Sequence, residues 1–138
     1  MIWDPKAECC SREDLERLQL SRLKDTLQMV YARVEHFRRS FDAHGVHPDQ
    51  LKTLDDLKRF PFLTKHEILD QYPFGMFAVP MSEVVRVHSS SGTTGHPLVV
   101  GYTKRDLEIW TEVVARLVCA AGVSSEDVVQ IAFSYGLF

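Results

Sequence analysis

The chain has 138 residues, of which 45% are hydrophobic and 25% are charged, and its formal net charge is −3. This length allows one modest domain, and the composition is ordinary for a soluble globular protein. The mild charge and the absence of a basic patch interleaved with aromatics argue against a nucleic-acid partner. No apolar run is long enough to cross a membrane, and residues 1–5 do not begin a signal peptide. The three cysteines form neither a disulfide framework nor a metal-binding pair, so a cytoplasmic setting is expected.

Residues from about 11 to 80 are expected to form a helical lead-in. Ser11 suits a helix N-cap, and acidic residues follow it in the first turn. Apolar residues then recur at alternating spacings of three and four: Leu20, Leu23, Leu27, Val30, Val34, Phe37 and Phe41. This seam fits a coiled coil, or an amphipathic helix that breaks near 34–37 and lies on a globular body. We favour the second, because Leu15, Leu18 and Met29 widen the apolar stripe.

Residues 49–80 read as short helices joined by proline turns. Gly45 is expected to end the preceding helix, and Thr64 to begin a new one, because Glu67 has the capping-box spacing. Three histidines in or just before this region lack the regular spacing and cysteine neighbours of a zinc site; they are His44, His47 and His66.

A loop rich in hydroxyl groups lies between two apolar runs, 84–88 and 98–102, that are typical of strands. It reads Ser89, Ser90, Ser91, Gly92, Thr93, Thr94, Gly95, His96 and Pro97. Glycine allows successive N–H groups to converge, and hydroxyls add donors, so the loop could wrap a polyphosphate. Its glycine spacing and ending differ from those of a Walker A loop. A flexible Ser/Gly connector is the alternative, although ordered flanking strands disfavour it.

A further helix is predicted after the second strand, because Thr103 and Asp106 repeat the capping spacing. Its apolar face comprises Leu107, Trp110, Val113, Val114, Leu117, Val118 and Ala121, and Gly122 closes it. Residues 128–133 are expected to form a buried strand. The order strand, helix, strand implies a parallel pair, so the predicted fold class is α/β with an incomplete sheet.

The segment from Ser90 to Gly95, followed by x-Pro, resembles the phosphate-binding loop of the adenylate-forming enzymes, the acyl-CoA synthetase superfamily. Its surroundings are similar to phenylacetate–CoA ligases at residues 72–74, 77–80, 84–88, 99–103 and 135–138. The likeness runs from about residue 15 to the end, in the family's order. The resemblance implies that residues 1–138 are part of the N-terminal, AMP-binding domain of such a ligase. Residues 84–138 would form its strand–loop–strand–helix–strand core, and the C-terminal domain would be absent.

The resemblance implies a reaction in which an arylacetate carboxylate attacks the α-phosphate of ATP, and coenzyme A then displaces AMP. It assigns the ATP phosphates, with Mg²⁺, to Ser90, Ser91, Gly92, Thr93, Thr94, Gly95 and His96. It assigns the aryl pocket to Phe133, Tyr135 and Phe138. The family's catalytic lysine has no counterpart here, so these residues alone are expected to be inactive. The full-length enzyme could be a homodimer.

Two positions depart from the family pattern. His96 stands where relatives often carry lysine, which makes the charge near the pyrophosphate dependent on pH. Phe133 and Ser134 stand where tyrosine and glycine are common, which bears on aryl specificity. Three alternatives stay open: a ligase for another aryl acid, a stand-alone phosphate-binding module, and a helical interaction module.

Overall fold

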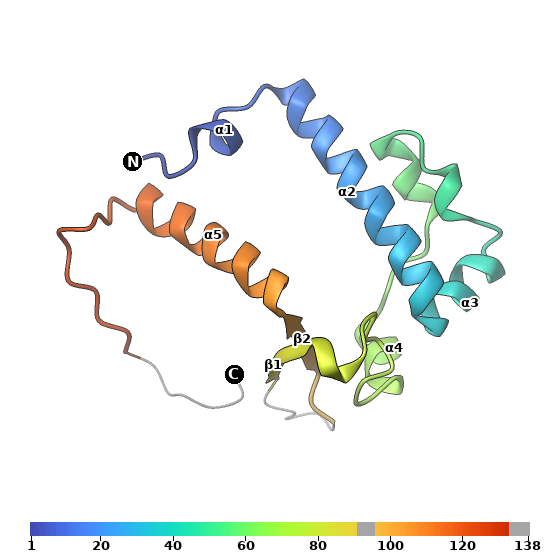
Figure 1. Cartoon of the computed structure of the whole chain (residues 1–138). Helices are drawn as coiled ribbons and strands as arrows, with labels where there is room; N and C mark the ends of the chain where they lie inside the picture. The colour runs from blue at the N-terminus through green and yellow to red at the C-terminus, as the bar shows by residue number, and fades with distance from the viewer. Residues whose placement is uncertain (91–95, 133–138) are drawn as a thin grey trace.

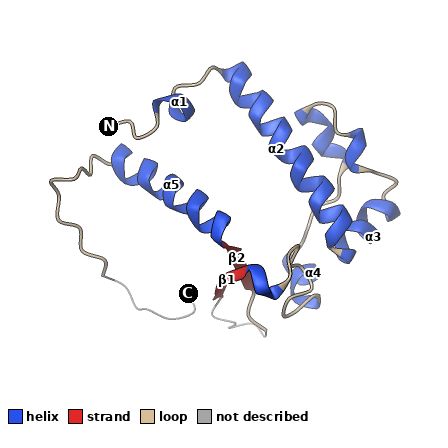
Figure 2. Cartoon of the chain, in the orientation of Figure 1, coloured by secondary structure: helices blue, strands red, loops and turns tan. Residues whose placement is uncertain are grey.

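The computed structural model describes residues 1–90 and 96–132 (Figure 1). The elements in chain order, with η for a 3₁₀ helix, are α1 (Pro5–Glu8), α2 (Arg12–Arg33), α3 (Glu35–Ala43), η1 (Pro48–Gln50), η2 (Leu54–Arg59), α4 (Lys65–Asp70), η3 (Met81–Glu83), β1 (Val84–Ser89), β2 (Val99–Thr103) and α5 (Lys104–Ala120). Helices dominate the described residues, and the strands form one small sheet (Figure 2). This agrees with the predicted α/β class and its incomplete sheet.

The long helical segment is divided at Val34. Helix α2 begins after Ser11, whose Oγ accepts a hydrogen bond from the backbone N–H of Asp14. Val34 has extended backbone angles, φ −116° and ψ 110°, so the helix stops there and α3 starts in a new direction. Gly45 follows α3 with φ 62°, a conformation that glycine adopts without a steric penalty. The predicted break and the predicted glycine ending are both present.

The buried core of the described residues lies where α2 and α3 pack with η1 and η2. Its buried hydrophobic side chains are Leu27, Val34, Phe41, Val46, Leu51 and Phe60. The Phe41 ring lies 5.9 Å from that of Phe37 and 5.2 Å from that of Phe60. The heptad-spaced residues therefore pack on their own chain, as an amphipathic helix does and a coiled coil does not. The stripe is narrower than predicted, because Leu18 and Met29 are 42% and 40% exposed.

Strands β1 and β2 form an antiparallel hairpin with α5 directly after it. His88 pairs with Val100 and Ser89 with Val99, so the strands meet at the base of the hydroxyl-rich loop. Thr103 is the N-cap of helix α5 and forms the predicted capping box with Asp106. The Thr103 N–H donates to the Asp106 carboxylate at 2.8 Å, and the Asp106 N–H donates to the Thr103 hydroxyl at 3.2 Å. The hairpin and α5 thus form one continuous unit.

The strand expected at 128–133 is not present in its described part. Residues 128–132 have no regular secondary structure, and Val128 is fully exposed. The sheet contains only β1 and β2 among the described residues, so the expected parallel pair is also not formed there. A strand requires a neighbour for its backbone hydrogen bonds, and hydrophobicity alone does not provide one.

The Phe41 side chain sets the stability of the helical core. We expect Phe41→Ala to lower the free energy of unfolding by about 3–5 kcal/mol, because a buried ring is replaced by a cavity. Chemical denaturation followed by circular dichroism measures this change. Phe62→Ala is the matched control, since Phe62 is 96% exposed and should change stability little. An equal effect of the two changes would contradict this assignment of the core.

We expect the capping hydrogen bonds at the start of α4 to be lost at acid pH. Hydrogen bonds from the Thr64 hydroxyl and N–H to Glu67, at 2.6 Å and 2.7 Å, hold the pKa of that carboxyl below its ordinary value. Their contribution is therefore full above the ordinary glutamate pKa of about 4.3, and is lost as pH falls through the lower folded pKa. The Thr64 amide resonance should follow this titration by NMR. Glu67→Gln should abolish it, whereas Glu108→Gln on α5 should leave it unchanged.

Candidate functional site

The base of the hydroxyl-rich loop is closed by two hydrogen bonds between Ser90 and Leu98. The Ser90 N–H donates to the Leu98 carbonyl oxygen at 2.9 Å. The Leu98 N–H donates to Ser90 Oγ, also at 2.9 Å. In the second bond a side-chain oxygen replaces the backbone carbonyl that a strand pair would normally offer. This bond fixes the Ser90 rotamer at the loop entrance. Ser90 Oγ still has its proton to donate, because a hydroxyl can accept and donate at once.

The other end of the loop is held by an aromatic contact. The His96 imidazole stacks on the Tyr72 ring, with centroids 4.7 Å apart and planes 20° from parallel. Tyr72 lies in the turn after α4, where its N–H donates to the Leu69 carbonyl oxygen at 3.0 Å. Two segments far apart in sequence thus meet at the closing end of the loop.

The turn that carries Tyr72 is docked on the hairpin through Gly101. A Cβ atom built at Gly101 would lie 2.6 Å from Cε2 of Phe77, which is closer than real Cβ contacts occur. The Phe77 ring also lies 5.2 Å from that of Phe74. The bare backbone of Gly101 is therefore required for this close approach. Phe77 and Tyr72 fasten one turn to the hairpin at two places.

A cluster of three aromatic rings joins the hairpin to α5. His88 on β1 lies 5.3 Å from Tyr102 on β2 and 5.6 Å from Trp110 on α5, between ring centroids. Tyr102 and Trp110 are 5.2 Å apart. Such edge-to-face and tilted contacts between aromatic rings contribute about 0.5–1.5 kcal/mol per pair beyond the burial of area. The cluster orients α5 on the strands that lead to the loop.

The structure describes two of the residues that the sequence assigned to the phosphates. Ser90 and His96 lie at the two ends of the loop, held by the contacts above. The remaining five lie outside the described residues: Ser91, Gly92, Thr93, Thr94 and Gly95. The predicted aryl-pocket residues Phe133, Tyr135 and Phe138 also lie outside them.

Sequence reasoning missed Tyr72 and Leu98 as parts of this site. The Tyr72–His96 contact spans 24 positions along the chain (96 minus 72), and no local pattern indicates it. Leu98 contributes only backbone groups, which every residue except proline has. The hydroxyl-rich sequence of the loop indicates the hairpin, but it does not indicate the residues that hold the ends of the loop.

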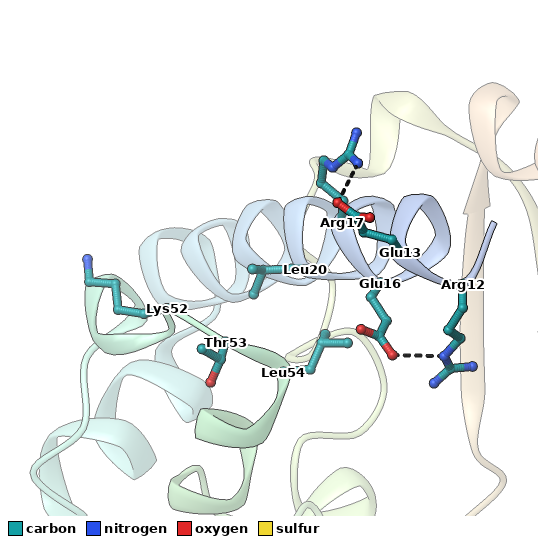
Figure 3. A pocket seen from close by; sticks show the side chains of 8 residues that line it. All are labelled: Arg12, Glu13, Glu16, Arg17, Leu20, Lys52, Thr53 and Leu54. Carbon is teal, nitrogen blue, oxygen red and sulfur yellow. Dashed lines mark hydrogen bonds and ion pairs between the residues drawn. The ribbon is translucent and has the colours of Figure 1, made fainter. Parts of the chain in front are cut away.

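An open surface pocket of about 500 Å³ lies at the start of α2 (Figure 3). Its lining residues are Arg12, Glu13, Glu16, Arg17, Leu20, Lys52, Thr53 and Leu54. The charges beside it pair locally, with Arg12 Nε 2.8 Å from Glu16 Oε1 and Arg17 Nη2 3.1 Å from Asp14 Oδ1. The charged lining residues of α2 thus pair along one helix, and Lys52 adds one further cation to the lining.

The described residues contain no cluster of three or more His, Cys, Asp or Glu side chains suited to a metal ion. No helix in the described part of the chain is long and apolar enough to cross a membrane.

The described fold is similar to solved acyl-CoA ligases. A crystal structure of 2-hydroxyisobutyryl-CoA ligase, in the postadenylation state with 2-HIB-AMP, matches with a TM-score of 0.88 and 28% identity. The match covers 99% of this chain and 30% of that one. The same ligase with 2-HIB-AMP and CoA, in the thioesterification state, matches with a TM-score of 0.81 and 30% identity over 88% of this chain and 27% of that chain. The class defined by this fold and loop is that of the adenylate-forming CoA ligases.

Sequence comparison identifies the family more narrowly. The chain is 55% identical over 131 residues to the phenylacetate–coenzyme A ligase of Aromatoleum evansii, and 53% identical over 131 residues to that of Escherichia coli. The ligase of Thermus thermophilus is 51% identical over all 138 residues. These matches place the chain in the phenylacetate–coenzyme A ligase family. They cover 95–100% of this chain but only 30–31% of the curated relatives. No protein-family model matches the chain.

Proposed function

We propose that this chain is the phosphate-binding part of an ATP-dependent ligase that activates phenylacetate and transfers it to coenzyme A. The observation that carries the proposal is a hydroxyl- and glycine-rich loop closed at both ends, in a sequence 50–55% identical to phenylacetate–coenzyme A ligases. The complete enzyme would use ATP as its magnesium complex. Because ATP and coenzyme A are cytoplasmic metabolites, we expect it to act in the cytoplasm, and a homodimer remains a prediction.

The proposed chemistry has two transfers. A carboxylate oxygen of phenylacetate attacks the α-phosphorus of ATP. The bond from that phosphorus to the oxygen bridging the α- and β-phosphates breaks, so pyrophosphate leaves and the acyl-adenylate remains. The coenzyme A thiolate then attacks the acyl carbon, and AMP leaves. Such steps need position and charge stabilisation more than covalent help from the protein. Hydroxyl and N–H donors on Ser90 to Gly95 would hold the β- and γ-phosphates during the first transfer.

The identity of the carboxylic acid substrate has less support than the use of ATP and coenzyme A. The similar solved ligase has a 2-hydroxyisobutyryl adenylate bound, whereas the relatives above 50% identity are named for phenylacetate. Higher identity favours phenylacetate, and another aryl acid is the alternative. Phe133, Tyr135 and Phe138 are proposed as aryl contacts in either case.

The loop hydroxyls should serve ATP and not the acid. In a complete ligase carrying this sequence, we expect Thr93→Val with Thr94→Val to lower phenylacetate-dependent pyrophosphate exchange by roughly 10²-fold, because valine keeps the shape but removes donors. Binding of phenylacetate, measured by calorimetry without ATP, should change little. Thr111→Val on α5 is the matched control, since Thr111 hydrogen-bonds its own helix. Equal losses of exchange and of acid binding would contradict the assignment.

Phe138 should contact the aryl group. It follows Gly136 in the sequence, and an aromatic residue is not one that turns require. Phe138→Ala should raise KM for phenylacetate by about 10- to 100-fold through lost apolar contact, with KM for ATP and the melting temperature nearly unchanged. A large fall in melting temperature with normal kinetics would instead assign Phe138 to the core.

A further inference from the structure

The Tyr72 ring covers one face of the His96 imidazole at the closing end of the loop. A parallel stack with planes 20° apart uses the face of each ring and leaves the ring edges uncovered. Both imidazole nitrogens lie in the ring plane, so the stack does not occupy them. An imidazole held in this way presents its N–H groups in a fixed plane, whereas a free histidine side chain samples several rotamers.

Tyr72 is itself held by the surrounding backbone. Its N–H donates to Leu69 at the end of α4, and the Gly75 N–H donates to the Gln71 carbonyl oxygen at 2.8 Å on its other side. Phe77, farther along the same turn, closes on the bare backbone of Gly101 in β2. The turn is thus fixed to the strand that leads out of the loop, and Tyr72 meets His96 at a defined place.

We propose that Tyr72 is a positioning residue for ATP phosphates: it orients the His96 imidazole so that a ring N–H is directed to the loop's anionic ligand. The proposal rests on the proposed phosphate-binding function of the loop. Tyr72 does not touch the ligand in this proposal and acts only through His96. Its phenol oxygen has no part in the proposal, so phenylalanine should replace it and an aliphatic side chain should not.

A double-mutant cycle in the complete ligase tests the proposal. Tyr72→Leu should raise KM for magnesium-ATP by about 2- to 12-fold, the range that an aromatic pair supplies. Tyr72→Phe should restore the wild-type value, and KM for phenylacetate should not change in either variant. In a His96→Ala background, Tyr72→Leu should have no further effect, because the residue through which it acts is gone. Phe62→Leu is the control, being an equivalent change at an exposed ring without a role in the stack.

An NMR measurement on the 138-residue chain tests the stack without activity. The Tyr72 ring current should shift the resonances of the His96 ring protons upfield. This upfield shift should be retained in Tyr72→Phe and lost in Tyr72→Leu. The proposal would be overturned if Tyr72→Leu changed KM for magnesium-ATP equally with and without His96. It would also be overturned if the His96 ring-proton shifts were unchanged in Tyr72→Leu. If Thr93→Val with Thr94→Val leaves ATP kinetics unchanged, the phosphate-loop function itself fails. If that variant behaves as expected but the cycle shows no coupling, only the role of Tyr72 fails.

Discussion

Burial of the apolar seam at the α2–α3 break is the constraint on which the folded core depends. The buried hydrophobic side chains of the described residues all lie between Leu27 and Phe60. They meet because the extended backbone at Val34 turns α3 so that Phe41 reaches η2 and Phe60. A straight helix through this point would place the same residues along one outer stripe. The break thus converts a heptad-like pattern into an intramolecular core.

The part of the chain that carries the candidate site is supported in a different way. None of the described residues from 84 onward is buried, and the apolar face of α5 includes Val113 and Leu117, which are 54% and 68% exposed. A two-stranded sheet with little burial is marginal by itself. Directional contacts must therefore hold the hairpin: the Ser90–Leu98 pair, the His88–Tyr102–Trp110 cluster, and Phe77 on Gly101. The chain spans about 30% of the length of the curated relatives it matches.

The helix starts are predictable from the sequence, because local chemistry decides them. Caps at Ser11, Thr64 and Thr103 mark the helix starts, because a side-chain oxygen satisfies a backbone N–H within three residues. The sequence does not predict the structure where a partner element decides it. Residues 128–132 have strand composition but no partner strand among the described residues, and they stay exposed without regular structure. The docking of the first residues on α5, through Asp4 and Arg116 at 3.2 Å, is equally invisible in the local sequence.

The support found at the loop ends gives a physical meaning to a histidine at position 96. A lysine ammonium carries a permanent charge on a flexible stem and has no planar face to stack. The His96 imidazole gives up the permanent charge, but its flat ring can lie against Tyr72 at 4.7 Å and gain a fixed plane. Ser90 at the other end also combines two roles. Its Oγ accepts a hydrogen bond from the Leu98 N–H, and its hydroxyl proton stays available to donate. Both end residues thus combine support with donor capacity, which is what the proposed phosphate-binding function requires of them.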